Sequence, residues 1–260
     1  MITTLLTFDT LDSTNTEALK HARQGAAEGL CITARQQTAG RGRYGRTWVS
    51  AKDAGLYFSI ILRPKLETQF LPLLTLMAGV AVHDMLQEYG LKPDIKWVND
   101  ILVNEKKISG ILAETAECPA GLAVVVGVGV NLSSENFPQE IAGTATSIEE
   151  LTGLKVAPEE AAGTLTKFLT YFYNTLASRS GPAATVDEWR KRSTYFSGKA
   201  VLVASGNETI KGKTDGLEPN GALRVLRPDG SVTIIQAGDV ERLRAEVGDS
   251  DGLNVTGPKC

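Results

Sequence analysis

Ten residues of the chain, Ala39–Trp48, read AGRGRYGRTW and contain three glycines and three arginines. Gly40, Gly42 and Gly45 match the G-x-G-x-x-G pattern of dinucleotide-binding loops, which joins a strand to a helix in a doubly wound parallel sheet. A strand is expected before these glycines, but Arg46–Val49 after them is rich in β-branched and aromatic side chains and begins no amphipathic helix. The stretch therefore argues against a doubly wound fold.

Patterns before residue 195 mix helices with strands that are joined by hairpins. Helices are predicted over residues 13–25, 70–90, 158–178 and 186–195, and strands over residues 6–12, 30–37, 55–64 and 121–132. DIKWVND, ILV, a turn at 104–106 and KISGILAE predict a β-hairpin. This mixture indicates an α+β domain over residues 1–195.

The pattern changes after Ser197. KAVLVAS, TIKGKTDGL, ALRVLR and VTIIQAG are separated by turn residues and by no helical pattern. Turns at intervals of about 8–12 residues are typical of a small all-β barrel. We therefore predict a β-domain over residues 196–245 and a flexible tail over residues 246–260.

Composition excludes several function classes. A net charge of −3 over 260 residues provides no broad basic surface for coating nucleic acid. We expect no membrane-spanning run and no signal peptide, and hence a cytoplasmic protein. Three cysteines and two histidines lack metal-type spacing, so no His/Cys metal site is expected.

Charge suggests an anion site in the glycine-rich loop. From Gly29 to Lys52 the chain has five basic residues and no acidic one. Glycines beside Arg41 let backbone N–H groups approach an anion, and guanidinium groups bind carboxylates and phosphates in a bidentate manner. A solvated mobile loop and a contact to RNA backbone are the alternatives.

Five motifs, in order along the chain, resemble those of biotin–protein ligases. They are DSTN (12–15), QTAGRGRYGR (37–46), KWVND (96–100), KKISGILAE (106–114) and GVGVNL (127–132). Together they cover the region from about Leu5 to Leu132, and the later helices and the small β-domain are consistent with the family. Val98 stands where the family most often has proline, which we expect to alter loop stiffness rather than chemistry.

The resemblance implies a fold and a two-step reaction. The fold would be a mixed, largely antiparallel sheet flanked by helices, with a C-terminal SH3-like β-barrel. ATP would activate biotin to biotinyl-5′-AMP, and the biotinyl group would pass to a lysine of a biotin carboxyl carrier protein, a subunit of acetyl-CoA carboxylase. Fixed cations and Mg²⁺ suit this chemistry because a carboxylate and a triphosphate repel each other.

Carried over position by position, the family's biotin site falls on Ser13, Thr14, Asn15, Gln37, Arg41, Gly42, Arg43 and Lys107. Ser13 and Thr14 have an alternative role as helix caps, with Thr14 and Glu17 forming a capping box. Lys107 has an alternative role as a surface residue of the hairpin. Arg41, Arg43, Trp48 and Asn131 are expected at ATP or the adenylate, although Trp48 also suits a half-buried core position.

The implied catalytic residues are Lys107, Arg43 and Asp100. Lys107 would lie beside the biotin carboxylate and the α-phosphate, and Arg43 would belong to a loop that closes over the adenylate. Asp100 would position substrate, help to hold Mg²⁺ or accept the proton of the acceptor lysine; alternatively, it only forms a turn before the hairpin. We expect no other fixed metal site.

The catalytic pattern begins by Leu5, so we expect no N-terminal helix-turn-helix domain and no direct DNA binding. The family includes homodimers formed through the catalytic sheet, and the sequence leaves monomer and dimer open. A lipoate or other acyl–protein ligase, a non-enzymatic nucleic-acid-binding module and a catalytically silent biotin-binding protein are the competing functions. Gln37 and the complete GRGRYGR loop favour biotin, and the presence of Lys107, Asp100 and Arg43 argues against a silent protein.

Overall fold

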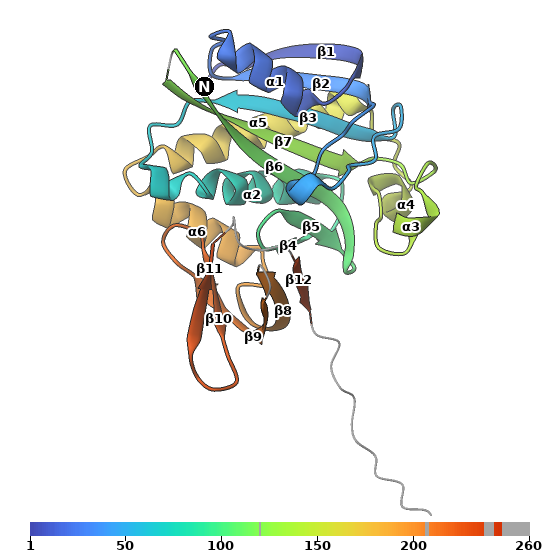
Figure 1. The fold of residues 1–260 in the computed structure, drawn as a ribbon. Helices are drawn as coiled ribbons and strands as arrows, with labels where there is room; N and C mark the ends of the chain where they lie inside the picture. Colours follow the sequence, from blue (N-terminus) through green and yellow to red (C-terminus); the bar gives the residue numbers. More distant parts are fainter. Residues whose placement is uncertain (120, 206–207, 237–241, 246–260) are drawn as a thin grey trace, which may run out of the picture.

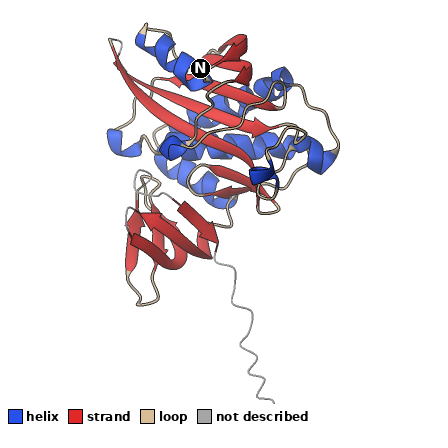
Figure 2. Ribbon diagram, turned by 45° about the vertical axis from the view of Figure 1, so that its right-hand side comes forward, coloured by secondary structure: helices blue, strands red, loops and turns tan. Residues whose placement is uncertain are grey.

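The computed structural model describes residues 1–119, 121–205, 208–236 and 242–245 of the 260-residue chain (Figure 1). The tail predicted over residues 246–260 lies outside the described residues. The described part forms a large sheet with helices on both faces and a smaller sheet at one end of it (Figure 2).

The large sheet has seven strands. They lie in the order β1 (Thr4–Leu11), β2 (Leu30–Gln37), β3 (Gly55–Leu62), β7 (Gly121–Asn131), β6 (Lys106–Cys118), β5 (Asp100–Val103) and β4 (Asp94–Lys96). Among these described strands only β1 and β2 pair in parallel, and every other neighbouring pair is antiparallel. The predicted α+β fold with a mixed, largely antiparallel sheet is therefore confirmed.

Neighbouring residues of a strand point to opposite faces of the sheet, so both faces carry apolar side chains that helices cover. On β3, Ile61 packs toward α1 (Thr14–Arg23), whereas Ile60 packs toward α2 (Leu73–Glu88) and α5 (Pro158–Leu176). Two short helices, α3 (Gln139–Ala142) and α4 (Ile148–Thr152), follow β7, and single 3₁₀ turns lie at η1 (Arg43–Gly45) and η2 (Thr68–Phe70).

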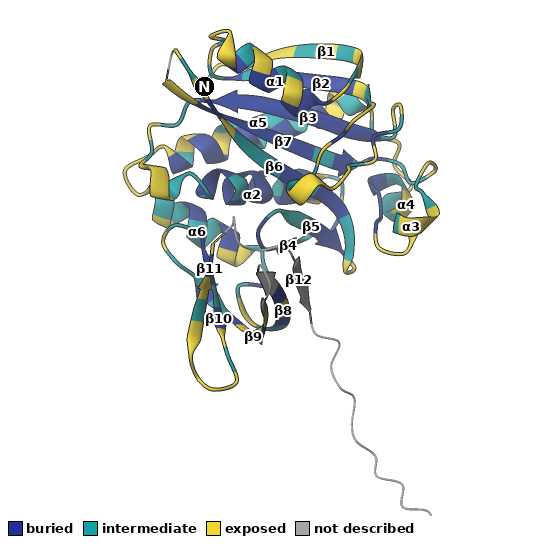
Figure 3. Ribbon diagram, viewed as in Figure 1, coloured by how far each residue is buried: buried dark blue, intermediate teal, exposed yellow. Residues whose placement is uncertain are grey.

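One segment corrects the expectation that the chain has no run fit to span a membrane. Thr68–Glu88 is long and apolar enough for this by length and composition alone. In the fold its helix α2 is buried against the sheet, α5 and α6 (Gly181–Lys191), as Figure 3 shows. A helix that is apolar on all sides is typical of this position in a protein core.

Helix α6 also differs from its predicted bounds of 186–195. It starts earlier because Pro182 occupies its first turn, where proline is favoured. It ends at Lys191, and Ser193 and Thr194 instead bond to β4: Ser193 Oγ donates to Ile95 O over 2.5 Å, and Thr194 N donates to Asp94 Oδ1 over 2.8 Å.

The described residues of the C-terminal domain form strands and no helix, as the turn spacing predicts, and these strands make a five-stranded antiparallel sheet. Its order is β11 (Val232–Ile235), β10 (Leu223–Leu226), β9 (Glu208–Leu217), β8 (Ser197–Ser205) and β12 (Arg242–Ala245). Trp97, which precedes the cis peptide bond to Val98, is buried and donates its indole N–H to Gly221 O over 2.9 Å. This bond joins the small domain to the segment between β4 and β5.

Candidate functional site

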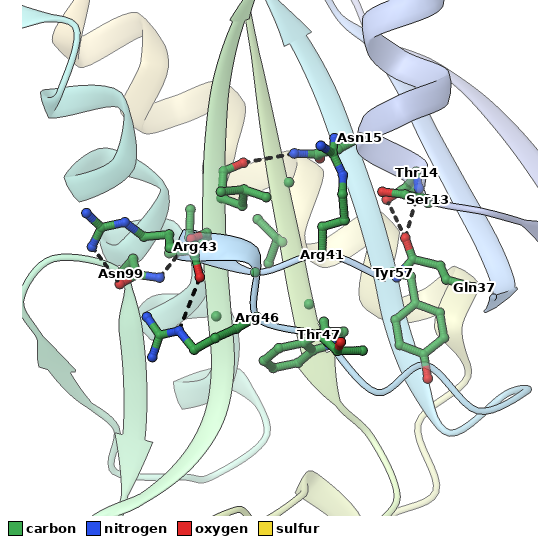
Figure 4. Close-up of a pocket in the computed structure, with 18 of the residues that line it drawn as sticks. Ser13, Thr14, Asn15, Gln37, Arg41, Arg43, Arg46, Thr47, Tyr57 and Asn99 are labelled. Atoms are coloured by element: carbon green, nitrogen blue, oxygen red, sulfur yellow. Dashed lines mark hydrogen bonds between the residues drawn. The ribbon is translucent and has the colours of Figure 1, made fainter. Parts of the chain in front are cut away.

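A pocket of about 120 Å³ lies on the face of the sheet that carries α1, beneath the glycine-arginine loop (Figure 4). It brings together nine predicted site residues: Ser13, Thr14, Asn15, Gln37, Arg41, Gly42, Arg43, Trp48 and Lys107. Asp100 lies beside this group, with its Oδ1 atom 2.6 Å from Lys107 Nζ. Asn131 lines a neighbouring cavity instead.

Glycines on β6 and β7 form part of the pocket floor. A Cβ atom on Gly127 would overlap Asn15 Oδ1, and one on Gly129 would overlap the Trp48 indole. A Cβ atom on Gly110 would lie 3.0 Å from the same indole. The glycines of GVGVNL are therefore required because polar and aromatic side chains lie directly against the backbone there.

The start of α1 belongs to the pocket and is not capped in the way the sequence suggests. Within the described residues, the Ser13 side chain caps no N–H of α1, and Glu17 pairs with Lys20 and His21 instead of Thr14. The predicted capping box is therefore wrong. Thr14 N donates to Gln37 Oε1 over 2.8 Å, because β2 brings Gln37 alongside this helix end.

Three cations from the predicted set have different surroundings. Arg41 Nη2 lies 2.8 Å from Glu114 Oε2. Lys107 Nζ contacts Asp100 and lies 5.4 Å from the centroid of the Trp48 ring. Arg43 is near Asn99, and burial lowers the pKa of its guanidinium from the usual value, although the group stays charged at neutral pH.

A fourth cation was missed from the sequence. Lys96 lies opposite Asp100 in the β4–β5 ladder, and burial lowers the pKa of its ammonium, an effect that nearby Lys107 and Arg46 increase and Asp100 opposes. Lys96 is the first residue of the KWVND motif, but a lysine that precedes a tryptophan does not by itself indicate a site residue. Only the strand pairing reveals that it faces the same carboxylate as Lys107.

A second cavity of about 190 Å³ adjoins the first across Trp48 and Lys107. Phe137 and Ile141, from the segment after β7, form its apolar wall, and both were missed from the sequence because they follow no motif. Asn131 Nδ2 donates to Thr146 O over 2.9 Å. The side chain of Asn131 thus lines the cavity, and its amide group holds this segment against the sheet.

The pocket has a polar end and a cationic end. Hydroxyl and amide groups of Ser13, Thr14 and Gln37 lie at one end, and the guanidinium groups of Arg43 and Arg46 lie at the other, as Figure 4 shows; Lys107 also lines the pocket. Such a site suits a small acid with a hydrogen-bonding ring, with its carboxylate near a second anion. The part of the chain that the structure describes contains no cluster of three or more His, Cys, Asp or Glu side chains fit to bind a metal ion.

Comparison with known proteins agrees with this arrangement. Residues 7–131 match the biotin/lipoate A/B protein ligase family, and residues 196–243 match the biotin protein ligase C terminal domain. The bifunctional ligase/repressor BirA of Bacillus subtilis is 35% identical over 243 residues, which are 91% of this chain and 73% of that protein. The biotin–[acetyl-CoA-carboxylase] ligase of Paracoccus denitrificans is 34% identical over 241 residues, 88% of this chain and 96% of the relative.

Comparison with solved structures leads to the same family. The biotin protein ligase of Aquifex aeolicus, in complex with biotin and ATP, superposes with a TM-score of 0.82 at 30% identity, covering 94% of this chain and all of that one. The motifs, the fold and these relatives lead to one conclusion: the chain belongs to the biotin protein ligase family.

Proposed function

We propose that the protein activates biotin with ATP to biotinyl-5′-AMP and transfers the biotinyl group to a lysine of a biotin carboxyl carrier protein. The observation that carries this proposal is the pocket itself, which is lined by neutral hydrogen-bonding groups and by the cations Arg43 and Lys107. Relatives named biotin–[acetyl-CoA-carboxylase] ligase support the choice of substrate and acceptor.

In the first step the biotin carboxylate attacks the α-phosphate of ATP, a bond to the α-phosphorus forms, and pyrophosphate leaves. Negative charge gathers where the two anions meet. Lys107 and Arg43 would stabilise it, and preorganised charges of this kind contribute about 10²–10³ in rate. The ureido ring of biotin would bond to Thr14 and Gln37, whose positions the α1–β2 contact fixes.

The nucleotide would occupy the second cavity. Trp48 separates the two cavities and offers a ring face for stacking, while Phe137 and Ile141 supply apolar contacts for a base. Lys107 lines both cavities, so one ammonium would contact the biotin carboxylate and the α-phosphate together. Asn131 would contribute mainly by holding the cavity wall in place.

In the second step the acceptor lysine, as a neutral amine, attacks the acyl carbon, and AMP leaves. Asp100 is the carboxylate closest to Lys107 and would accept the amine proton or position the substrate. It also fits Mg²⁺, which is commonly held by one or two protein carboxylates together with substrate phosphates. The metal would neutralise phosphate charge, and Asp100 would be its protein ligand.

The direct test is ATP–pyrophosphate exchange with purified protein, Mg²⁺ and either biotin or lipoate. Exchange with biotin alone supports the proposal. Exchange with lipoate alone keeps the adenylation chemistry but overturns the substrate, and exchange with neither overturns the function. Transfer is then followed by avidin blotting of a carrier domain, with its acceptor lysine changed to arginine as the control.

A further inference from the structure

Glu114, on β6, joins two parts of the pocket through a single atom. Its Oε2 atom accepts one hydrogen bond from Arg41 Nη2 and another from Asn15 Nδ2, each 2.8 Å long. Arg41 belongs to the glycine-arginine loop and points toward Asn15 at the start of α1, as Figure 4 shows. Loop, helix and sheet therefore meet at one carboxylate oxygen, which stands behind the pocket wall.

This contact fixes the orientation of the Asn15 amide. Its Nδ2 atom also donates to Leu112 O over 3.2 Å, and its Oδ1 atom lies 2.6 Å from Ser59 Oγ. Ser59 is fully buried and lies 2.8 Å from Thr14 Oγ1. Reversing the amide would place its NH₂ group against the Gly127 backbone and its oxygen against Glu114. The negative charge of Glu114 therefore favours the observed orientation.

The same hydrogen-bond chain reaches the other end of the loop. Gln37 Oε1 accepts from Thr14 N over 2.8 Å, and Gln37 Nε2 donates to Ser50 Oγ over 2.8 Å. Ser50 Oγ in turn donates to Trp48 O over 3.0 Å. A continuous polar network thus runs from Arg41, through the pocket floor, to Trp48, and a change at one end disturbs the groups proposed to meet the ureido ring.

We infer that Glu114 is a positioning residue of the biotin site: its carboxylate holds the loop through Arg41 and orients the pocket amide of Asn15. The inference rests on the proposed function, since biotin is the ligand that this network would receive. It also assigns Arg41 to loop anchoring, because its guanidinium binds the same Glu114 oxygen as the Asn15 amide.

Limited trypsin digestion without added ligand tests the anchoring role. Trypsin cleaves after arginine, and the loop contains Arg41, Arg43 and Arg46. We expect Glu114→Gln to be cut in the loop about fivefold faster than wild type, the size expected for a partly exposed ion pair. Glu117→Gln, which removes an exposed charge from the same strand, serves as the matched control and should digest like wild type. Equal rates for wild type and Glu114→Gln would overturn the inference.

Titration calorimetry with biotin alone tests the positioning role. Glu114→Ala should raise the Kd for biotin about tenfold. Glu114→Gln keeps an acceptor for Asn15 and should recover part of this loss. The KM for ATP at saturating biotin should stay within about twofold of wild type; a parallel rise in both constants would indicate general damage and contradict the inference. If the wild-type protein bound no biotin, the proposed function would fall, whereas digestion would still decide whether Glu114 anchors the loop.

Discussion

Lys107 Nζ lies 2.6 Å from Asp100 Oδ1, so the lysine proposed to meet the reacting carboxylate already has a carboxylate partner on the neighbouring strand. The two residues come from β6 and β5, whose pairing brings Lys107 opposite Leu102. A biotin carboxylate must compete with Asp100 for the same ammonium. The charge on Asp100 is therefore expected to oppose biotin binding even if it is needed for the reaction.

Asp100→Asn separates these two effects. We expect pyrophosphate exchange to slow by about 10²-fold, in line with the loss of one preorganised charged group. The Kd for biotin, measured by calorimetry without ATP, should stay equal or fall, because the competing carboxylate is gone. Biotin affinity that weakens in step with the exchange rate would contradict this account.

Lys107→Ala should abolish exchange while the far-ultraviolet circular dichroism stays unchanged, since the side chain is partly exposed. Lys106→Ala is the control, because strand alternation turns that residue to the other face, where its Nζ atom lies 3.8 Å from Glu150. Near-normal exchange in Lys107→Ala would remove this residue from the reacting centre.

The main elements of the fold were readable from the sequence because they rest on local signals. The hairpin of β5 and β6 follows from its turn residues, and α2 from a long apolar run that ends at Gly90. The site residues were placed through motifs that resemble a known family. Lys96 and Glu114 were not identified, since their roles depend on which strands lie side by side. The capping box at Thr14 failed for the same reason: a partner on β2 took its place.

The buried ammonium of Lys96 leads to a prediction about how the KM for ATP depends on pH. Burial lowers the pKa of this ammonium from its usual 10.5, so the proton is lost at a lower pH than in a free lysine. If its charge assists binding of the triphosphate, the KM for ATP rises as pH increases through that lowered pKa. Lys96→Arg should shift the rise to higher pH because arginine stays charged. Steady-state kinetics from about pH 7 to 10 measure this, and identical profiles for the two proteins would refute it.

Asp84 and Arg192 provide a prediction for stability. Arg192 Nε and Nη2 bond to the two oxygens of Asp84 over 2.6 and 2.8 Å, joining α2 to the end of α6. Burial alone would raise the pKa of Asp84, but hydrogen bonds from His83 and Arg192 outweigh it and lower the pKa. The stabilisation is therefore present above the unfolded-state pKa and is lost as pH falls through the folded-state value.

Asp84→Asn should accordingly lower the free energy of unfolding at pH 7 by about 2 kcal/mol, because it removes one of the two carboxylates that pair with the partly buried Arg192 and leaves Glu188 as the other. It should also flatten the dependence of that free energy on acidic pH. Glu88→Gln breaks a more exposed pair with Lys167 and should cost less than about 1 kcal/mol. Urea unfolding at several pH values measures both, and equal costs for the two variants would show that burial of the Asp84 pair has no effect.

Trp48 and Gly129 supply the last prediction, which concerns the wall between the two cavities. A methyl group at Gly129 would overlap the Trp48 indole, so Gly129→Ala must push the ring toward the ligands. We expect the KM for ATP to rise at least tenfold. Gly163→Ala is the matched control: Gly163 lies in α5, and a Cβ atom added there would meet no atom within 4 Å, so alanine should stabilise the helix by up to about 1 kcal/mol. Trp48→Phe in the Gly129→Ala background makes the ring smaller and should restore part of the ATP affinity. No recovery in this double variant would mean that Gly129 matters for a reason other than the fit of Trp48.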